Sequence, residues 1–246
     1  MMRLLAFLLL LLPLPVAGED IVAALSQSRI SITANFDGSE ILVFGAIKRD
    51  APVSGDAPLD VIITVAGPEQ VEVLRRKDRR LGIWVNVEAR VIGHTPTFYT
   101  VAATRPLGDV LPNLTDTLWK ISAEKRILPA MRGLAAREAL LRIRRAEGVY
   151  ATDGTAVDLI EDTLFRSSIA LPANLVEGAY TTRIFLVRDG RVIDSYGTSI
   201  NVQKVGIERW LYRLAYDHAF IYGLLALFIA VVFGWGASEA FRLLRR

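Results

Sequence analysis

Arginine and lysine side chains gather in one short segment, and these are the residues of the chain best suited to binding a ligand. Guanidinium groups donate paired hydrogen bonds to oxyanions, so such a cluster can clamp a small anion or a lipid headgroup. A charged hairpin tip that simply meets solvent is the alternative, and anionic lipid would satisfy the same groups at a membrane. The candidate anion-binding residues lie between two predicted strands and are Arg75, Arg76, Lys77, Arg79 and Arg80.

Other residues that could bind a metal are few. The chain has no cysteine and two histidines, which excludes disulfides and thiolate ligands and leaves little imidazole chemistry. His94 stands in a predicted polar loop that could line a pocket, without a second ligand at metal-binding spacing. An acidic cluster surrounds Gly154 but lacks the spacing of a calcium loop, so we interpret it as solvated. We therefore expect no cofactor and no metal. The cluster comprises Asp153, Asp158, Glu161 and Asp162.

Two function classes are disfavoured by motif and charge. The sequence has no glycine-rich phosphate loop, no Gly-x-Ser-x-Gly elbow and no paired-histidine helix motif, so we predict that the protein is not an enzyme. Its net charge is +3, yet residues 19–218 carry equal numbers of basic and acidic side chains. The excess belongs to the two apolar ends, whereas a nucleic-acid-binding protein carries it on the folded part. We therefore predict no nucleic-acid partner.

The first 18 residues have the pattern of a signal peptide. Arg3 precedes an apolar run that is too short to span a bilayer, and Pro13 and Pro15 break it before small residues. We expect cleavage after Gly18. An uncleaved N-terminal anchor is the alternative.

Residues 219–238 form an uncharged apolar segment of 20 residues. At 1.5 Å per residue a helix of this length covers about 30 Å, the thickness of the hydrocarbon core. The basic tail at 239–246 places the C-terminus in the cytoplasm by the positive-inside rule. Residues 205–217 are predicted to form an amphipathic helix at the membrane surface. The expected membrane-interface residues are Trp210, Tyr212, Trp235, Arg242, Arg245 and Arg246.

Residues 19–204 are predicted to form an exported β-sandwich domain. Apolar and polar residues alternate with the period of a strand in several short segments, and turn formers separate them. Short strands at this spacing are typical of an antiparallel sandwich. The segments are residues 30–32, 41–47, 61–65, 84–88, 97–101 and 163–171.

Residues 113–147 break this strand pattern and predict a helical insertion. Leu140 and Ile143 recur at helical spacing, and Gly148 follows in the position that ends many helices. A shorter helix is expected around residues 117–125.

Two features near the end of the predicted domain favour an Ig-like sandwich. The pattern Leu175-x-x-Gly178-x-Tyr180 resembles a tyrosine corner, and Asp189-Gly190 is a strong hairpin signal. We predict a mainly β protein, an Ig-like antiparallel β-sandwich with a helical insertion and one C-terminal transmembrane helix. The alternative is two domains, a β-rich one before about residue 110 and a smaller α+β one after it.

The layout as a whole resembles an uncharacterised transmembrane protein family of alphaproteobacteria. The resemblance lies in the signal peptide, the alternation over residues 30–47, the basic segment that leads to Trp84, the corner with its hairpin, and the C-terminal span. It implies a bacterial inner membrane with the domain in the periplasm, and it supplies no activity and no catalytic residues.

We predict from these features a single-pass, non-enzymatic protein whose periplasmic sandwich binds a protein partner. Besides the lipid bilayer, the expected partner is another integral membrane protein, such as a transporter to which this chain is an accessory subunit. Two alternatives stay open. One is a periplasmic module that binds a small oxyanion through the basic segment, and the other is a structural component of the envelope.

Overall fold

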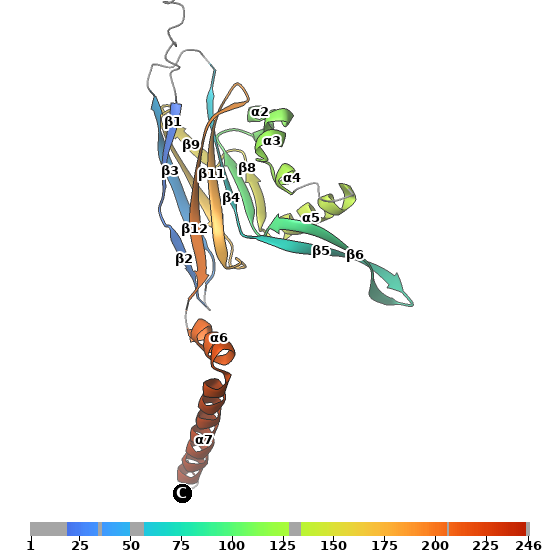
Figure 1. The fold of residues 1–246 in the computed structure, drawn as a ribbon, viewed down its shortest axis with the longest axis vertical. Helices are drawn as coiled ribbons and strands as arrows, with labels where there is room; N and C mark the ends of the chain where they lie inside the picture. Colours follow the sequence, from blue (N-terminus) through green and yellow to red (C-terminus); the bar gives the residue numbers. More distant parts are fainter. Residues whose placement is uncertain (1–18, 34–35, 50–56, 128–133, 206, 245–246) are drawn as a thin grey trace, which may run out of the picture.

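The chain forms two β-sheets packed face to face, a helical layer on one of them, a projecting hairpin and a C-terminal helix (Figure 1). The computed structural model describes residues 19–33, 36–49, 57–127, 134–205 and 207–244. The predicted signal peptide, residues 1–18, lies outside the described residues. Strands dominate, as the sequence predicts, and each of the two sheets combines strands from before and after residue 110.

The four-stranded sheet has the order β1-β3-β10-β9 and is antiparallel throughout. Exposed and buried side chains alternate strictly along β10, because one face of the sheet packs on the core and the other meets solvent. Ile41, Val43 and Ile169 belong to the buried set. The strands are β1 (Glu19–Leu25), β3 (Ser39–Arg49), β9 (Val157–Ile160) and β10 (Leu164–Leu171).

The six-stranded sheet has the order β2-β12-β11-β4-β7-β8. Every residue of β4 is buried, because the strand is central and both of its faces are covered. The outermost pairs, β2 with β12 and β7 with β8, are parallel, which departs from the all-antiparallel prediction. The helical segment between β7 and β8 is the long crossover that a parallel pair needs. The strands are β2 (Arg29–Ile32), β4 (Leu59–Ala66), β7 (Tyr99–Ala103), β8 (Tyr150–Asp153), β11 (Gly178–Arg188) and β12 (Arg191–Lys204).

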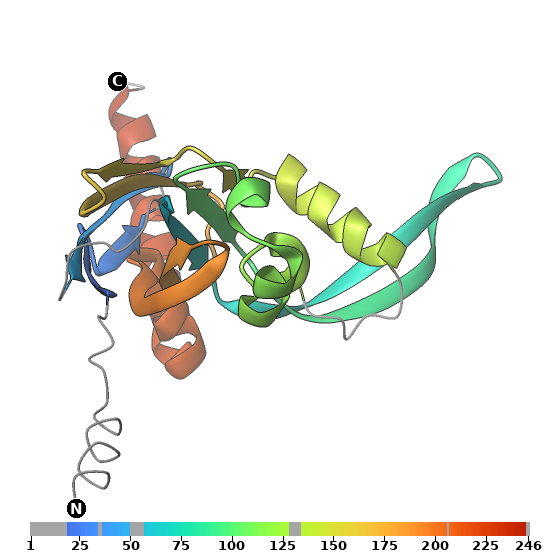
Figure 2. The ribbon, with the colours of Figure 1, turned by 90° about the horizontal axis from the view of Figure 1, so that it is seen from above.

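Between β7 and β8 the described residues form four helices, which lie beside the six-stranded sheet (Figure 2). They occupy the region where the sequence predicts a helical insertion. Ile121, Ile127, Leu140 and Leu141 are buried in the common core, so this layer packs on the sandwich. The helices are α2 (Leu107–Val110), α3 (Asn113–Trp119), α4 (Ala123–Arg126) and α5 (Leu134–Ala146).

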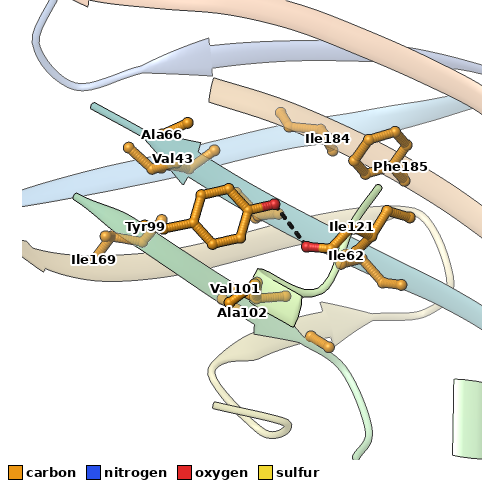
Figure 3. Packing of buried hydrophobic residues seen from close by; sticks show 14 of the residues in the cluster. Val43, Ile62, Ala66, Tyr99, Val101, Ala102, Ile121, Ile169, Ile184 and Phe185 are labelled. Carbon is orange, nitrogen blue, oxygen red and sulfur yellow. Dashed lines mark hydrogen bonds between the residues drawn. The ribbon is translucent and has the colours of Figure 1, made fainter. Parts of the chain in front are cut away.

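Side chains of the six-stranded sheet fasten the turn between α3 and α4. The Tyr99 hydroxyl donates to the Ile121 carbonyl at 2.6 Å (Figure 3). Arg183 donates to two carbonyls at the end of α3, at 3.0 and 3.1 Å. Asp116 accepts from the Ile121 N–H at 3.1 Å. The bonds from Tyr99 and Arg183 satisfy carbonyls at and just beyond the end of α3, and Asp116 of α3 itself satisfies an N–H of the turn.

The predicted corner and hairpin both have the expected geometry. The Tyr180 hydroxyl donates to the Val176 carbonyl at 2.9 Å and accepts from the Val176 N–H at 3.2 Å. Between β11 and β12, Asp189 and Gly190 have φ of +50° and +69°, the left-handed pair that a two-residue hairpin turn requires.

The strands β5 (Glu69–Arg80) and β6 (Ile83–Pro96) form a separate two-stranded hairpin, hereafter the arm. It leaves the sandwich and projects away from it (Figures 1 and 2). Leu81 and Gly82 make its turn, both with positive φ. The basic segment, which we predicted between two strands at a hairpin tip, is itself the outer half of β5 and leads into the turn of the hairpin. Because β5 is exposed over most of its length and charged, it lacks the alternation that marks a half-buried strand.

The C-terminal part consists of α6 (Ile207–Asp217) and α7 (Ala219–Leu244). The segment Ala219–Ser238 of α7 has a mean hydropathy of 2.2, and none of it is buried. It is the one helix of the described residues that is long and apolar enough to cross a membrane, and its bounds coincide with the predicted span. The sandwich, α6 and α7 follow one another along the long axis of the molecule (Figure 1).

Candidate functional site

The predicted anion-binding residues all lie on the outer half of β5. Arg75, Arg76, Lys77, Arg79 and Arg80 are exposed. Because successive side chains on a strand point to opposite faces, these five groups do not form a single cluster. They divide along the arm into an inner part near α5 and an outer part near the turn.

The inner part lines a groove between the arm and α5, which run alongside each other (Figure 2). Its volume is about 450 Å³. Alanine side chains of α5 and arginines of both elements line the groove. The lining residues are Leu74, Arg75, Arg76, Glu88 and Arg90 on the arm, and Ala135, Ala136, Ala139, Arg142 and Ile143 on α5.

The groove carries more positive than negative charge. Glu88 is its acidic residue and already has two partners, Arg90 at 2.5 Å and Arg76 at 3.5 Å. The neighbouring Arg90 guanidinium lowers the pKa of Glu88, so this carboxylate stays ionised. Within the described part of the chain, Arg75 and Arg142 form no salt bridge. These two guanidinium groups remain available to an anion.

The outer part of the basic segment accompanies exposed apolar side chains. Leu81, Ile83 and Trp84 are 104%, 65% and 69% exposed, and Lys77, Arg79 and Arg80 precede them. The six residues are hereafter the tip. The sequence analysis identified the charges and Trp84 but not the exposed Leu81 and Ile83, because adjacent exposed positions of a turn have no periodicity to detect.

The outer face of the four-stranded sheet carries an apolar surface that crosses all four strands. The register places Val22 beside Ala46, Ala46 beside Leu164, and Leu164 beside Ile160. Val22, Leu164 and Ile160 are 61%, 51% and 48% exposed. Phe44, also exposed, extends the surface, and the same five residues line a shallow hollow. They are hereafter the apolar row, which sequence reasoning did not identify.

The remaining sequence candidates are not brought together. His94 is exposed on β6, not in a loop. Asp158 of the acidic cluster pairs with Arg166 at 3.0 Å. The described residues contain no group of three or more His, Asp or Glu side chains that could hold a metal ion.

The predicted membrane-interface residues lie on α6 and α7. Trp210, Tyr212 and Trp235 are all exposed, and the Tyr212 ring lies 4.5 Å from that of Tyr216, centroid to centroid. Arg242 lies in the last turn of α7. Arg245 and Arg246 lie outside the described residues.

A β-sandwich followed by one exposed apolar helix defines a class of protein, the single-span membrane protein with a folded domain on one side of the bilayer. Residues 20–243 match the family described as "Putative transmembrane protein (Alph_Pro_TM)", and the chain belongs to this family. The family resemblance drawn from the sequence is thereby confirmed, and the apolar helix agrees with a single-pass membrane location.

Comparison with other proteins adds little beyond the family. No curated protein matches the chain. Among solved structures, the crystal structure of Spo0M, a sporulation control protein from Bacillus subtilis, is similar with a TM-score of 0.32 and 11% sequence identity. The match covers 81% of this chain and spans about half of the other, 55%.

Proposed function

We propose that this chain is a membrane-anchored, non-enzymatic binding module whose β-sandwich docks a protein partner through the apolar row. The observation that carries the proposal is the continuity of that row across all four strands of one sheet. A contiguous exposed apolar surface costs solvation free energy and is typical of an interaction site. Isolated exposed apolar residues would carry no such meaning.

The neighbourhood of the apolar row favours a protein over a charged ligand. Among the described residues, an ion pair on this face joins Arg166 to Asp158 at 3.0 Å, so these two charges compensate each other. An apolar centre beside paired charges resembles the core and rim of a protein–protein interface. The partner surface is expected to be apolar where it meets Val22, Leu164 and Ile160.

We further propose that the partner is an integral membrane protein of the bacterial inner membrane and that they meet in the periplasm. The signal-peptide pattern of residues 1–18 and the C-terminal arginines support this orientation. Confining both proteins to one membrane raises their effective concentration, so a modest contact area suffices. A membrane transporter is our candidate partner, with this chain as its accessory subunit.

Photo-crosslinking in living cells tests the proposal. A photoreactive amino acid is placed at Phe44 or Leu164, and at Ser195 on β12 as an exposed control. Covalent capture of the same integral membrane protein from the first two positions, and not from Ser195, is the expected result. Capture of a second copy of this chain alone, or of nothing, would contradict the proposal, and the latter would favour a structural role in the envelope.

A charged side chain in the apolar row should abolish the complex without unfolding the domain. Leu164→Lys places an ammonium group at the centre of the contact, where burying it unpaired is costly. Co-purification of the captured partner should be lost, whereas Ser195→Lys should retain it. Both variants change exposed positions, so their free energies of unfolding should stay within about 0.5 kcal/mol of the parent chain.

The groove supports a second candidate function, the binding of a small oxyanion by Arg75 and Arg142. Both guanidinium groups line it, and neither forms a salt bridge within the described residues. Calorimetric titration of the detergent-solubilised full chain with sulfate should then give heat that Arg142→Gln abolishes and Arg166→Gln does not. An absence of heat at millimolar sulfate would exclude this function.

A further inference from the structure

We propose that the tip of the arm is a second membrane contact, which docks on the anionic lipid surface of the bilayer that α7 spans. The tip comprises Lys77, Arg79, Arg80, Leu81, Ile83 and Trp84. This contact is independent of the apolar row, which lies on the sandwich itself.

The apex of the arm presents apolar side chains where a hairpin turn ordinarily has polar ones. Leu81 adopts φ of +50° and Gly82 φ of +87°. Asn, Asp or Gly normally occupies the first of these positions, because other residues disfavour a left-handed backbone. Leu81 instead is fully exposed at the apex, beside exposed Ile83 and Trp84. Such a turn gains stability only when something apolar receives these side chains.

The basic side chains beside the apolar apex indicate what kind of surface the tip contacts. Lys77, Arg79 and Arg80 flank the apolar apex, and no salt bridge joins them to the rest of the described chain. Asp78 is the acidic residue among them, and it accepts a hydrogen bond from the Arg79 N–H at 2.8 Å. Apolar and aromatic side chains bordered by basic ones match the layers of a membrane surface, with hydrocarbon beneath anionic headgroups.

Ion pairs fasten the base of the arm to the helical layer, so the fold determines the direction in which the arm leaves the sandwich. Glu69 pairs with Arg126 of α4 at 2.7 Å, and Glu72 pairs with Arg144 of α5. The Glu72 and Arg144 side chains are both largely buried, at 25% and 18% exposure. These bonds hold the start of β5 against the helical layer, and an antiparallel ladder with two register shifts connects this base to the tip.

The arm leaves the sandwich sideways and inclines slightly toward the end that bears α6 and α7 (Figure 1). Its turn is the point of the arm farthest from the sandwich and lies about level with the end of the sandwich that is nearer to α6. A chain already anchored by α7 presents the tip to the same bilayer at high effective concentration. A few basic and apolar groups therefore suffice for a stable contact, although they would bind a distant membrane weakly.

A fluorescent label at the apex tests the contact in the full chain. Because the chain has no cysteine, Leu81→Cys provides a unique site for a polarity-sensitive dye. Arg191→Cys, on an exposed residue next to the β11–β12 turn, is the control. Each labelled chain is reconstituted into phosphatidylcholine vesicles, with or without phosphatidylglycerol.

The proposal predicts a several-fold rise and a blue shift of the Leu81→Cys emission in vesicles that contain phosphatidylglycerol. A lipid-borne nitroxide should quench this emission, and the effect should be weaker in phosphatidylcholine alone. The Arg191→Cys label should behave as in water throughout. An aqueous spectrum at Leu81→Cys in both lipids would overturn the proposal.

Two further observations separate the membrane from other occupants. One such observation is a blue-shifted emission that the lipid-borne quencher does not reduce, and the other is a blue shift that disappears when the protein is diluted in lipid. Either would mean that protein covers the tip, and would overturn the proposal. The double substitution Arg79→Gln and Arg80→Gln is then added to the labelled Leu81→Cys chain. It should reduce the quenching by the lipid-borne nitroxide several-fold. The matched pair Arg166→Gln with Arg191→Gln, which removes the same charge from other exposed positions, should leave it unchanged.

Discussion

Three buried tyrosines of the described residues fasten neighbouring segments to the sandwich through their hydroxyl groups. Tyr99 donates to the Ile121 carbonyl, Tyr150 to the Pro96 carbonyl at 2.6 Å, and Tyr180 to the Val176 carbonyl. Each ring fills core space while its hydroxyl donates to a backbone carbonyl. These residues therefore connect core packing to the placement of the helical layer and the corner.

Replacement of Tyr180 by phenylalanine should destabilise the fold by about 1–2 kcal/mol, because the Val176 N–H and carbonyl lose their partner. Chemical denaturation of the detergent-solubilised full chain, followed by fluorescence, measures this difference. Tyr196→Phe is the matched control, since Tyr196 is exposed and should change stability by less than about 0.5 kcal/mol. Equal losses in both variants would show that the corner bond contributes nothing.

Alkaline pH should destabilise the protein through the same three residues. Burial raises the pKa of Tyr99, of Tyr150 and of Tyr180 above the ordinary value of 10.0. A raised pKa means that the folded state disfavours the phenolate. The stability that each buried, neutral tyrosine contributes is therefore complete below about pH 10 and is lost as pH rises toward the folded pKa. The free energy of unfolding should fall between about pH 10 and about pH 12, by up to about 1.4 kcal/mol per pH unit for each tyrosine. Tyr150→Phe should lessen the slope, and an unchanged slope would contradict this assignment.

Residue patterns could predict a local contact but not a distant one. Tyr180 was found from Leu175 and Gly178, because the corner is built within a few positions of the chain. The groove was not found, since Arg90 and Arg142 lie far apart in sequence and meet only because α5 packs beside the arm. The apolar row was missed for the same reason, as its register is set between strands from distant segments.

At the scale of elements, two hairpins with the same kind of turn differ in what surrounds them. The turn between β11 and β12 lies against the helical layer, and a Cβ on Gly190 would come within 2.5 Å of the Pro112 Cγ. The turn of the arm is open, and a Cβ on Gly82 would meet nothing within 4 Å. One turn is thus part of the packed fold, and the other is free to contact something else.

A pair of glycine substitutions should reveal this difference. Gly82→Ala should cost about 1 kcal/mol, the conformational penalty of a side chain at positive φ. Gly190→Ala carries the same penalty and also forces its Cβ into Pro112, which should add a further 1 to 3 kcal/mol, roughly. Thermal or chemical denaturation compares the two variants. Equal losses would mean that the β11–β12 turn does not pack on the start of α3.

Strands were predicted best where the core imposes a residue pattern, although residues 84–88 of the exposed β6 were also predicted and β1 was not. β3, β10 and the centre of β4 alternate or run apolar, because the core imposes the pattern. β5 has no buried face along its outer half, and β8 and β9 have four residues each. In these strands pairing with a neighbour, not local sequence, determines the structure.

For the whole molecule, the arrangement joins a folded sandwich to one apolar helix with no buried face. An exposed helix of mean hydropathy 2.2 would aggregate in water, and a bilayer removes that cost. The two proposals then assign different purposes to the tip and the apolar row. The tip would orient the sandwich on lipid, and the apolar row would receive a protein partner.

A charge in the middle of α7 should release the chain from the membrane. Leu227→Arg replaces an exposed apolar side chain by a charged one. Inserting arginine at the centre of the bilayer costs about 3 kcal/mol more free energy than inserting leucine, which lowers the insertion equilibrium constant roughly a hundredfold. The fraction of chain that stays with membranes after alkaline carbonate extraction should fall steeply. Leu118→Arg, on exposed α3 outside the span, should leave it unchanged. Carbonate strips contacts held by surface charge, so the tip alone cannot retain the protein. If the Leu227→Arg chain nevertheless stays in the membrane, α7 is not its principal anchor, and the apolar run in residues 1–18 would have to hold it.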